Sequence, residues 1–463
     1  MSDLPAAAFE ELSQRTEGPV FRPGRPGYDE ERSGFQTAFR HRPAVIVGAA
    51  GAADVSAAVT FADAHGLPVA VQATGHGLSA ATNGEGLLIS TRRMDGVHID
   101  PAARTARFEA GVRWEQVIAE AAPHGLAPLN GSAPHVGAVG YTLGGGLGIL
   151  ARQFGYAADH VRGIEVVTAD GALRQVTADS DPDLFWALRG GRDNFGVVTS
   201  MEVDLFPVSR LYGGGMFFPA ESVPDVFSAY LAWTTTVPEE LTSSVSLMAY
   251  PDLPMIPAPL RGRYVAHIRI AYTGDAASGE RLVAPLRAVA PRLIDSVQEM
   301  PYTASGTIYN DPAFPHAYYG NNVLLGEVDS STLVKTVLEV AGPDSPAMCV
   351  IDLRHLGGAL SRPPAVASAV GNRDARYILR VLTPLAASDI DIARPVHQRL
   401  FDAVRPWTTG RSLNFVYSDE DMPDQTSAVY APDDLRRLAE LKRVHDPANL
   451  FRHNHNIAPA AAR

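Results

Sequence analysis

A histidine enclosed by glycines follows a predicted strand early in the chain. Residues 73–79 read ATGHGLS and come directly after the apolar segment 67–72. Glycines let the backbone turn tightly and present several N–H groups to an anion. The histidine of such a turn, His76, would lie against whatever the turn binds. A tight turn with a simply hydrogen-bonded histidine is the alternative interpretation.

Six glycines among twelve residues mark a second segment, 137–148, which reads GAVGYTLGGGLG. This density predicts backbone that passes very close to another group, such as a pyrophosphate or a flat ring. A flexible linker is the alternative, and the interleaved valine, tyrosine and leucine argue against it. The strand–GxGxxG–helix pattern with an acidic residue about 20 positions later is missing, so a nicotinamide dinucleotide site is not predicted.

Two histidines near the C-terminus, His453 and His455, alternate with Asn454 and Asn456. No carboxylate or third histidine lies within this stretch, so we expect no metal there. The paired asparagines are better suited to hydrogen bonds with a polar ring edge.

Two further patterns carry weaker signals. Residues 193–199 form a predicted turn that enters a strand, which is typical of a core element. Asp352 and Arg354 stand two positions apart on one predicted strand, so their side chains share a face. That face is either part of a site or a solvated surface.

The composition limits the classes of function. With 463 residues, 46% apolar and 19% charged, the chain can build a large core or two domains. A net charge of −12 without a basic run argues against a nucleic-acid surface or an anionic-membrane anchor. The single cysteine, Cys349, allows no intrachain disulfide and no cysteine-based metal site. We find no secretory signal and no apolar run near the roughly 20 residues that span a bilayer, so we expect a cytoplasmic protein.

The order of the predicted elements indicates an α+β protein. From 43 to 207, short strands and helices alternate in a way that predicts mixed sheets and not a regular doubly wound fold. After 207, long strands alternate with helices, which favours an antiparallel sheet with helices on one face. We therefore expect three segments, with the boundaries 38–208, 209–410 and 411–463.

Taken together, these motifs resemble the FAD-linked oxidases of the vanillyl-alcohol-oxidase fold, with its PCMH-type FAD-binding domain. The similarity is to the berberine-bridge-enzyme-like branch, which includes bacterial 6-hydroxynicotine oxidases. It extends over nearly the whole chain and adds the runs 155–161 (GYAADHV), 183–191 (DLFWALRGG), 194–199 (NFGVVT) and 446–452 (DPANLFR). The resemblance implies that the first and last segments bind FAD. The middle segment would be a cap domain that covers the flavin ring with a substrate pocket.

The resemblance also implies roles for individual residues. His76 would bond covalently to the 8α carbon of FAD, because a neutral imidazole can attack the bound oxidised flavin there. The other expected cofactor-binding residues are Ala73, Thr74, Gly75, Gly77, Leu78, Ser79, Gly131, Ser132, Val136, Gly137, Gly140, Tyr141, Gly144, Gly196, Val198, Asn454 and Asn456. Tyr141 and Asp352 are our candidates for proton transfer, and the predicted substrate pocket includes Leu147, Ile149, Tyr250 and Arg354.

Two departures from the family pattern bear on the chemistry. Many relatives attach the flavin a second time through a cysteine in the run that here reads GSAP (131–134), where Ala133 takes its place. We therefore expect a single attachment. Several relatives also have a Tyr-x-Asn motif whose tyrosine assists proton removal, and here Ser412 replaces that tyrosine. This argues against the usual alcohol-oxidising base.

We expect FAD-dependent oxidation of a small heterocyclic, amine or natural-product substrate, with hydride transfer to flavin N5 and reoxidation by O₂ to give H₂O₂. The small side chain of Ala138, beside the predicted flavin loop, predicts open access for O₂. Alternatives are an oxygenating flavoenzyme that tailors a polyketide-like product and a sugar or alcohol oxidase. From a different class, the chain could bind flavin without turnover.

Overall fold

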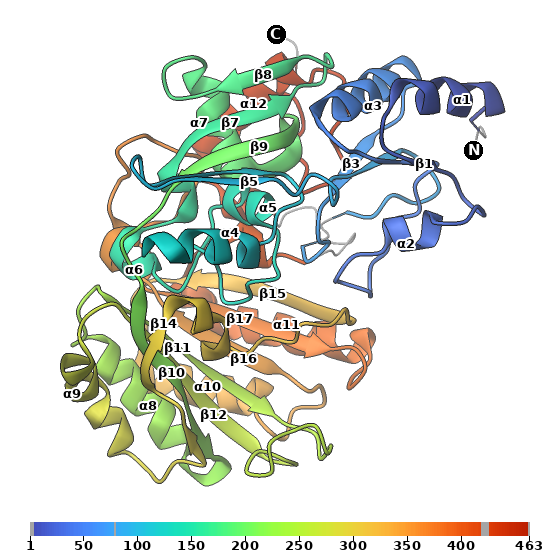
Figure 1. Cartoon of the computed structure of the whole chain (residues 1–463). Helices are drawn as coiled ribbons and strands as arrows, with labels where there is room; N and C mark the ends of the chain where they lie inside the picture. The colour runs from blue at the N-terminus through green and yellow to red at the C-terminus, as the bar shows by residue number, and fades with distance from the viewer. Residues whose placement is uncertain (1–3, 78–79, 418–425, 462–463) are drawn as a thin grey trace.

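Two regions of the molecule lie one above the other in Figure 1. The structure is a computed structural model that describes residues 4–77, 80–417 and 426–461. The upper region holds two sheets, and the lower region holds a third, larger sheet. Mixed helix and sheet confirm the predicted α+β class, whereas the boundaries at 208/209 and 410/411 stay predictions.

The first sheet runs in the order β1-β2-β4-β3 and carries the histidine loop. Its strands β2, β4 and β3 are parallel, and the chain crosses between β2 and β3 through α3 (Ala52–Ala64). The apolar strands are buried on both faces, as expected for parallel pairing. The loop that contains His76 follows the carboxyl end of β3. The strands are β1 (Val20–Phe21), β2 (Val45–Gly48), β3 (Val69–Gln72) and β4 (Leu87–Ser90); helix α1 (Ala6–Arg15) precedes β1, and α2 (Tyr28–Arg32) lies between β1 and β2.

The second sheet is antiparallel, in the order β5-β6-β9-β7-β8. The segment predicted as a glycine-rich loop contains a short helix, α5, because residues 138–143 include only one glycine. The strands are β5 (Val97–Asp100), β6 (Thr105–Glu109), β7 (Val161–Val167), β8 (Leu173–Val176) and β9 (Val197–Asp204). The helices are α4 (Trp114–Ala121), α5 (Ala138–Leu143), α6 (Ala151–Phe154) and α7 (Pro182–Gly191).

The third sheet forms the lower region of Figure 1 and is antiparallel throughout, in the order β13-β10-β12-β11-β16-β17-β15-β18, with β14 beside β10. The sequence predicts strands at 263–272, 349–353 and 377–382, which correspond to β12, β16 and β17, but misses the long strands β10, β11 and β15. The strands are β10 (Arg210–Pro219), β11 (Leu241–Ala249), β12 (Tyr264–Tyr272), β13 (Ile294–Asp295), β14 (Gln298–Pro301), β15 (Tyr318–Leu325), β16 (Val350–His355), β17 (Tyr377–Pro384) and β18 (Thr408–Gly410). The helices are α8 (Val223–Thr234), α9 (Ala276–Arg287), α10 (Ser330–Ala341) and α11 (Ile390–Val404).

The two faces of this third sheet differ in polarity. Alternate residues such as Ile351, Leu353 and Leu379 pack with α8, α10 and α11 in one apolar core. Their neighbours Asp352, Arg354 and Arg380 point to the opposite face, because side chains alternate along a strand. The predicted covering of one face by helices is confirmed, and the polar face is turned toward the upper region.

The C-terminal segment returns to the upper region through α12 (Pro432–His445). The Lys442 ammonium is completely buried and donates to the carboxylate of Asp446 at 2.6 Å and to the carbonyls of Asn194 and Phe451 at 2.6 and 2.9 Å. Asp446 also accepts the N–H groups of Leu450 and Phe451. These bonds fix the tail against the turn that precedes β9.

Asp446→Ala is expected to lower the free energy of unfolding by about 3–5 kcal/mol, because it leaves the buried Lys442 ammonium without its counter-charge. Denaturant unfolding followed by near-UV circular dichroism measures the change. Asp433→Ala removes an exposed carboxylate from the same helix and serves as the control, with a change within about 0.5 kcal/mol. Equal stability of the two variants would contradict this role of the pair.

Candidate functional site

A cavity of about 310 Å³ lies where the three sheets meet. This volume is within the range of about 300–1,000 Å³ that is usual for small-molecule and cofactor sites. Its walls include the end of β3, the start of β9 and the polar face of β15, β16 and β17. The predicted flavin loops and the predicted substrate sheet therefore border one space.

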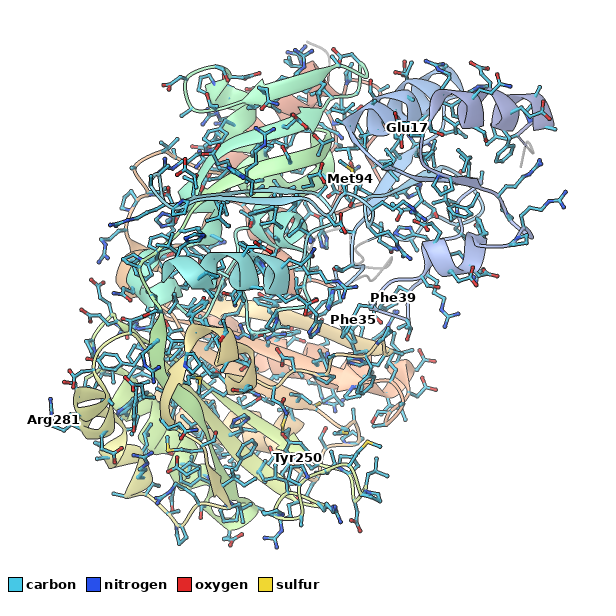
Figure 2. All side chains as sticks on the ribbon, in the orientation of Figure 1. Glu17, Phe35, Phe39, Met94, Tyr250 and Arg281 are labelled. Atoms are coloured by element: carbon cyan, nitrogen blue, oxygen red, sulfur yellow. The ribbon has the colours of Figure 1, made fainter. Side chains whose placement is uncertain are left out.

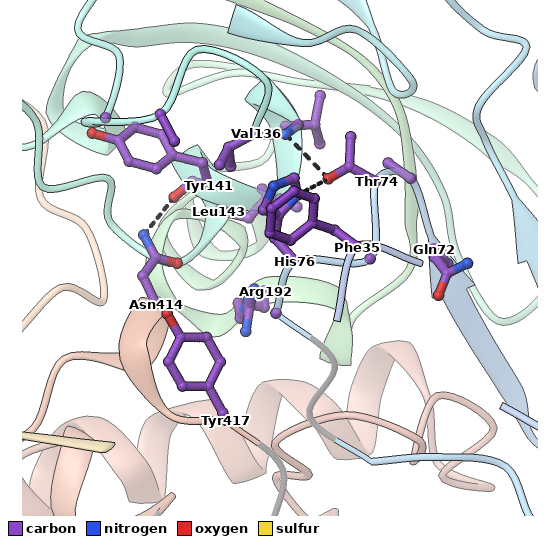
Figure 3. Close-up of a pocket in the computed structure, with 18 of the residues that line it drawn as sticks. Phe35, Gln72, Thr74, His76, Val136, Tyr141, Leu143, Arg192, Asn414 and Tyr417 are labelled. Atoms are coloured by element: carbon purple, nitrogen blue, oxygen red, sulfur yellow. Dashed lines mark hydrogen bonds between the residues drawn. The ribbon is translucent and has the colours of Figure 1, made fainter. Parts of the chain in front are cut away.

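His76 lies on this wall with its ring stacked on Phe35, 3.8 Å between centroids (Figure 3). Its Nδ1 is 2.8 Å from Oγ1 of Thr74, which also accepts the N–H of Gly137 at 3.3 Å. Its Nε2 is buried and has no partner among the described residues. Burial, helped by the nearby His135, lowers the pKa of His76 to about 3, so the imidazole is neutral at physiological pH.

The glycines of the segment 137–148 have two different uses. A Cβ at Gly146 or Gly148 would lie 2.8–2.9 Å from Tyr141, so these glycines make room for the tyrosine side chain. Gly144 leaves space for the Asn414 amide, which donates to the Tyr141 carbonyl at 2.8 Å. Only Gly140 of this group borders open space and also lines the cavity. The close approach predicted from these glycines is therefore in large measure an approach to protein side chains.

Tyr141 lines the cavity, and its hydroxyl is buried without a partner among the described residues. Burial raises the pKa of this hydroxyl well above its usual value, against a smaller opposing effect of the Arg354 charge. The hydroxyl therefore stays protonated at neutral pH. It can donate a hydrogen bond or a proton, but it is not a base.

Most of the predicted cofactor and pocket residues meet at this cavity. Those that line it are Ala73, Thr74, Gly75, His76, Gly77, Gly131, Ser132, Val136, Gly137, Gly140, Tyr141, Leu147, Gly196, Val198 and Arg354. They come from separate loops and strands, so the fold brings together motifs that are far apart in the sequence.

Other predicted residues lie elsewhere. Ile149 and Ala138 are packed in the core of the upper region, so the expected oxygen path beside Ala138 has no support in the cavity wall. Tyr250 follows β11 at the far end of the third sheet, beside Phe217 (Figure 2). Gly144, Asn454 and Asn456 do not line the cavity, and Asn456 is exposed. Leu78 and Ser79 lie outside the described residues.

The structure also corrects the predicted role of Asp352 in proton transfer. It stands behind the cavity wall and accepts hydrogen bonds from Arg269, Arg354 and Arg380 at 2.8–3.1 Å. Burial would raise the pKa of its carboxyl, but the three guanidinium charges outweigh burial and hold the pKa well below the usual value. Such a carboxylate does not take up a proton near neutral pH, so it is unsuited to the predicted role in proton transfer.

Several cavity residues were missed by sequence reasoning. Phe35 comes from an irregular segment before β2, and Figure 2 places it between the upper and lower regions. Arg192 follows α7 with a φ of 54°, a strained value for a residue with a side chain. Tyr318 and Tyr417 also line the cavity, and the Tyr318 hydroxyl donates to the His76 carbonyl at 2.7 Å. None of these positions has a local motif; only Phe35 and the tyrosines could have been suspected as aromatic residues near a site.

Five buried histidines make the fold sensitive to acid. Burial keeps their pKa values at about 3–4, while an unfolded histidine titrates near 6.5. The unfolded chain binds more protons than the folded chain between these values, so stability falls as the pH drops from about 6.5 toward 4. These histidines are His41, His76, His355, His397 and His455.

We expect the thermal unfolding midpoint to fall steadily between about pH 7 and pH 5 and to be insensitive to these groups above about pH 7.5. His397→Leu should reduce the slope, since it removes one of the five titrations. Exposed His124→Gln is the control and should leave the slope unchanged. A midpoint that rises on acidification would contradict this account.

The cavity residues fit FAD. A free, buried imidazole nitrogen stands on the wall, open backbone at Gly140 can lie against a flat ring, and Arg192 supplies a positive charge for an anionic group. In the portion of the chain that the structure describes, no group of three or more His, Cys, Asp or Glu residues is arranged to hold a metal ion. No described helix is long and apolar enough to cross a membrane.

Comparison with known proteins agrees with this fit. Residues 43–177 match the family model of the FAD binding domain, and residues 415–458 match that of berberine and berberine-like proteins. The (R)-6-hydroxynicotine oxidase of Paenarthrobacter nicotinovorans is 30% identical, over 96% of this chain and 97% of that protein.

Solved structures share the whole architecture. The crystal structure of 6-hydroxy-D-nicotine oxidase from Arthrobacter nicotinovorans superposes with a TM-score of 0.82 at 25% identity, covering 96% of this chain and 98% of that one. A chitooligosaccharide oxidase has the same fold, with a TM-score of 0.82 at 22% identity and coverage of 98% and 100%. The chain belongs to the berberine-bridge-enzyme-like family of FAD-linked oxidoreductases, and it is an FAD-dependent oxidase of small organic molecules.

Proposed function

We propose that the enzyme holds FAD covalently through His76 and oxidises a heterocyclic, amine or natural-product substrate with O₂ as the acceptor. The observation that carries this proposal is the neutral imidazole of His76, whose unpartnered Nε2 stands on the wall of the cavity. Bound FAD would accept a hydride from the substrate and pass two electrons to O₂, which gives H₂O₂. A cytoplasmic location is included in the proposal, and no oligomeric state is assigned.

Nε2 of His76 is the nitrogen we assign to the bond with the 8α carbon. When the neutral ring carries its proton on Nδ1, this N–H group donates a hydrogen bond to the hydroxyl oxygen of Thr74, and the lone pair of Nε2 is free. Phe35 fixes the plane of the ring by stacking, and Tyr318 fixes the backbone of the loop. Held in this way, the nucleophile needs little reorganisation. Ala133 lines the cavity where many relatives attach the flavin a second time, so the link is single.

Other residues of the cavity would bind the substrate and exclude water. Tyr141 donates a hydrogen bond to the substrate, and Leu147 and Phe415 exclude water from the same end of the cavity. Ser412 does not line the cavity; its backbone exchanges hydrogen bonds with the Asn322 side chain. A sugar or alcohol oxidase is therefore the second candidate, favoured only by the fold shared with the oligosaccharide oxidase.

Steady-state H₂O₂ release with a panel of cyclic amines, phenols, alcohols and sugars tests the proposed function. We expect one H₂O₂ per substrate oxidised, and reoxidation by O₂ faster than that of free reduced FAD in stopped-flow traces. Ala138→Leu should leave reoxidation unchanged, since Ala138 does not border the cavity. Oxygen incorporated from ¹⁸O₂ into the product would instead support an oxygenating flavoenzyme. Reduction of the flavin by no compound of the panel would favour a binding protein without turnover.

A further inference from the structure

Three arginines converge on a single carboxylate on the polar face of the third sheet. Arg269 on β12, Arg354 on β16 and Arg380 on β17 donate to Asp352 at 3.1, 2.8 and 2.8 Å. Strand register brings them together, since Asp352 pairs with Arg380, and Ser244 on β11 lies between Arg269 and Arg354. The arrangement is therefore built into the sheet itself.

The positive charge of this cluster exceeds its negative charge. The three arginine side chains are 6%, 8% and 16% exposed, and Asp352 is 7% exposed. Among the described residues that line the cavity, the acidic side chains are Asp311, which acts on Arg354 and accepts a hydrogen bond from Ser132 at 2.7 Å, and Asp193, which faces Arg192 and Lys442 instead. The three arginines against Asp352 and Asp311 leave one positive charge over. A buried charge without a partner is costly, so the excess calls for an anion from outside the chain.

Only two of the arginines reach the cavity. Arg354 and Arg380 line it, whereas Arg269 and Asp352 stand behind them. Arg354 uses Nε to bind Asp352, and among the described residues its two terminal nitrogens have no hydrogen-bond partner. Their donor edge is the one that matches the two oxygens of a carboxylate.

Aromatic rings hold the guanidinium groups in place. Phe415 lies 4.0 Å from the Arg380 guanidinium carbon and 5.3 Å from that of Arg354. Tyr309 lies 4.8 Å from Arg354 and 4.6 Å from Arg269 on the other side. Stacking of this kind fixes the plane of the fork, so recognition of a planar anion costs little side-chain entropy.

We propose that Arg354 and Arg380 form an anion site, so that the substrate of this oxidase carries a carboxylate or another planar, delocalised oxyanion. This inference rests on the proposed function, because it names the substrate class of the same cavity. The anion pairs with the two guanidinium groups, and the adjacent carbon to be oxidised lies toward Tyr141. A neutral analogue of the same shape would leave the excess charge unpaired.

Equilibrium binding to the oxidised holoenzyme tests the site without turnover. Benzoate is the probe and benzamide its neutral match, and the perturbation of the flavin absorbance spectrum is the signal. We expect benzoate to saturate the signal at concentrations at least about 10-fold lower than benzamide. Equal affinities for the two probes would overturn the anion site, while H₂O₂ release from neutral substrates would leave the proposed oxidase intact.

Variants of Arg354 test whether this residue is responsible for the preference for benzoate. Arg354→Gln should weaken benzoate about 10–100-fold and leave benzamide unchanged, and Arg354→Lys should recover some of the loss. The control is Arg281→Gln, on α9 at the opposite edge of the lower region (Figure 2), where benzoate binding should not change. If Arg354→Gln lowers FAD content or shifts the absorbance of the free holoenzyme, and benzoate affinity is kept, the arginine serves the cofactor and the proposal is wrong. The comparison of the two probes on unaltered enzyme does not depend on the variants folding.

Discussion

Replacing His76 with alanine is expected to remove covalently bound flavin completely. Acid precipitation of the unaltered enzyme should give a yellow pellet and a flavin-bearing peptide that contains His76, linked through Nε2. The variant should release all its flavin to the supernatant, because Ala133 offers no second nucleophile on that wall. Mass spectrometry of the protein and of its peptides measures the result directly.

The hydrogen bond to Nδ1 provides the matched pair of variants. Thr74→Ser keeps the hydroxyl and should retain full attachment, whereas Thr74→Val should slow attachment, since it removes the group that fixes the ring tautomer. A colourless pellet from the unaltered enzyme, with all flavin in solution, would refute covalent attachment. That result would not contradict noncovalent binding of FAD.

Tyr141→Phe is expected to slow reduction of the flavin by substrate about 10²–10³-fold, the usual contribution of a preorganised hydrogen-bond donor in a site that excludes water. The physical reason is a buried hydroxyl without a partner among the described residues, which burial keeps protonated. Anaerobic stopped-flow absorbance measures the rate, and FAD content should be unchanged. Because the pKa of the hydroxyl is raised above its ordinary value, the rate of the unaltered enzyme should show no decrease from this group up to about pH 10.

Tyr250→Phe removes the hydroxyl of a tyrosine that does not line the cavity, so its rate should stay within about threefold of the unaltered enzyme. If Tyr141→Phe also stays within this range, the hydroxyl only fills space among the glycines around it. The substrate would then be held by a hydrogen bond from another group of the wall, with Tyr417 the first to examine.

Local patterns in the sequence were enough for the histidine loop and for most of the α+β architecture. The glycines around His76 and the alternation in 350–355 each express a backbone constraint that can be read from neighbouring residues. The same patterns predicted a common face for Asp352 and Arg354, which the structure has.

The identity of partners across strands could not be predicted in this way. The residues next to Asp352 in the sequence give no sign of its two partners Arg269 and Arg380, which lie 83 and 28 residues away. Only the register of the strands brings these arginines to the carboxylate. The family resemblance implied a place in the pocket for Ile149, but the chain turns into α6 there and the Ile149 side chain enters the core. The position of Arg192 on the cavity wall depends on an unusual backbone conformation, which the sequence around it does not predict.

The walls of the cavity come from nearly the whole length of the chain, from Phe35 to His453. Translation at about 5–20 residues per second separates the synthesis of these two positions by roughly 20–80 s. For most of that interval the histidine loop exists without the complete opposite wall, which β15, β16 and β17 form, and the tail that Lys442 anchors is made last. The complete set of cavity walls therefore exists only after the C-terminal segment is made. Until then, apolar side chains such as Val139, Leu143 and Leu147 lack part of the wall that encloses them, and exposed apolar surface of this kind favours aggregation.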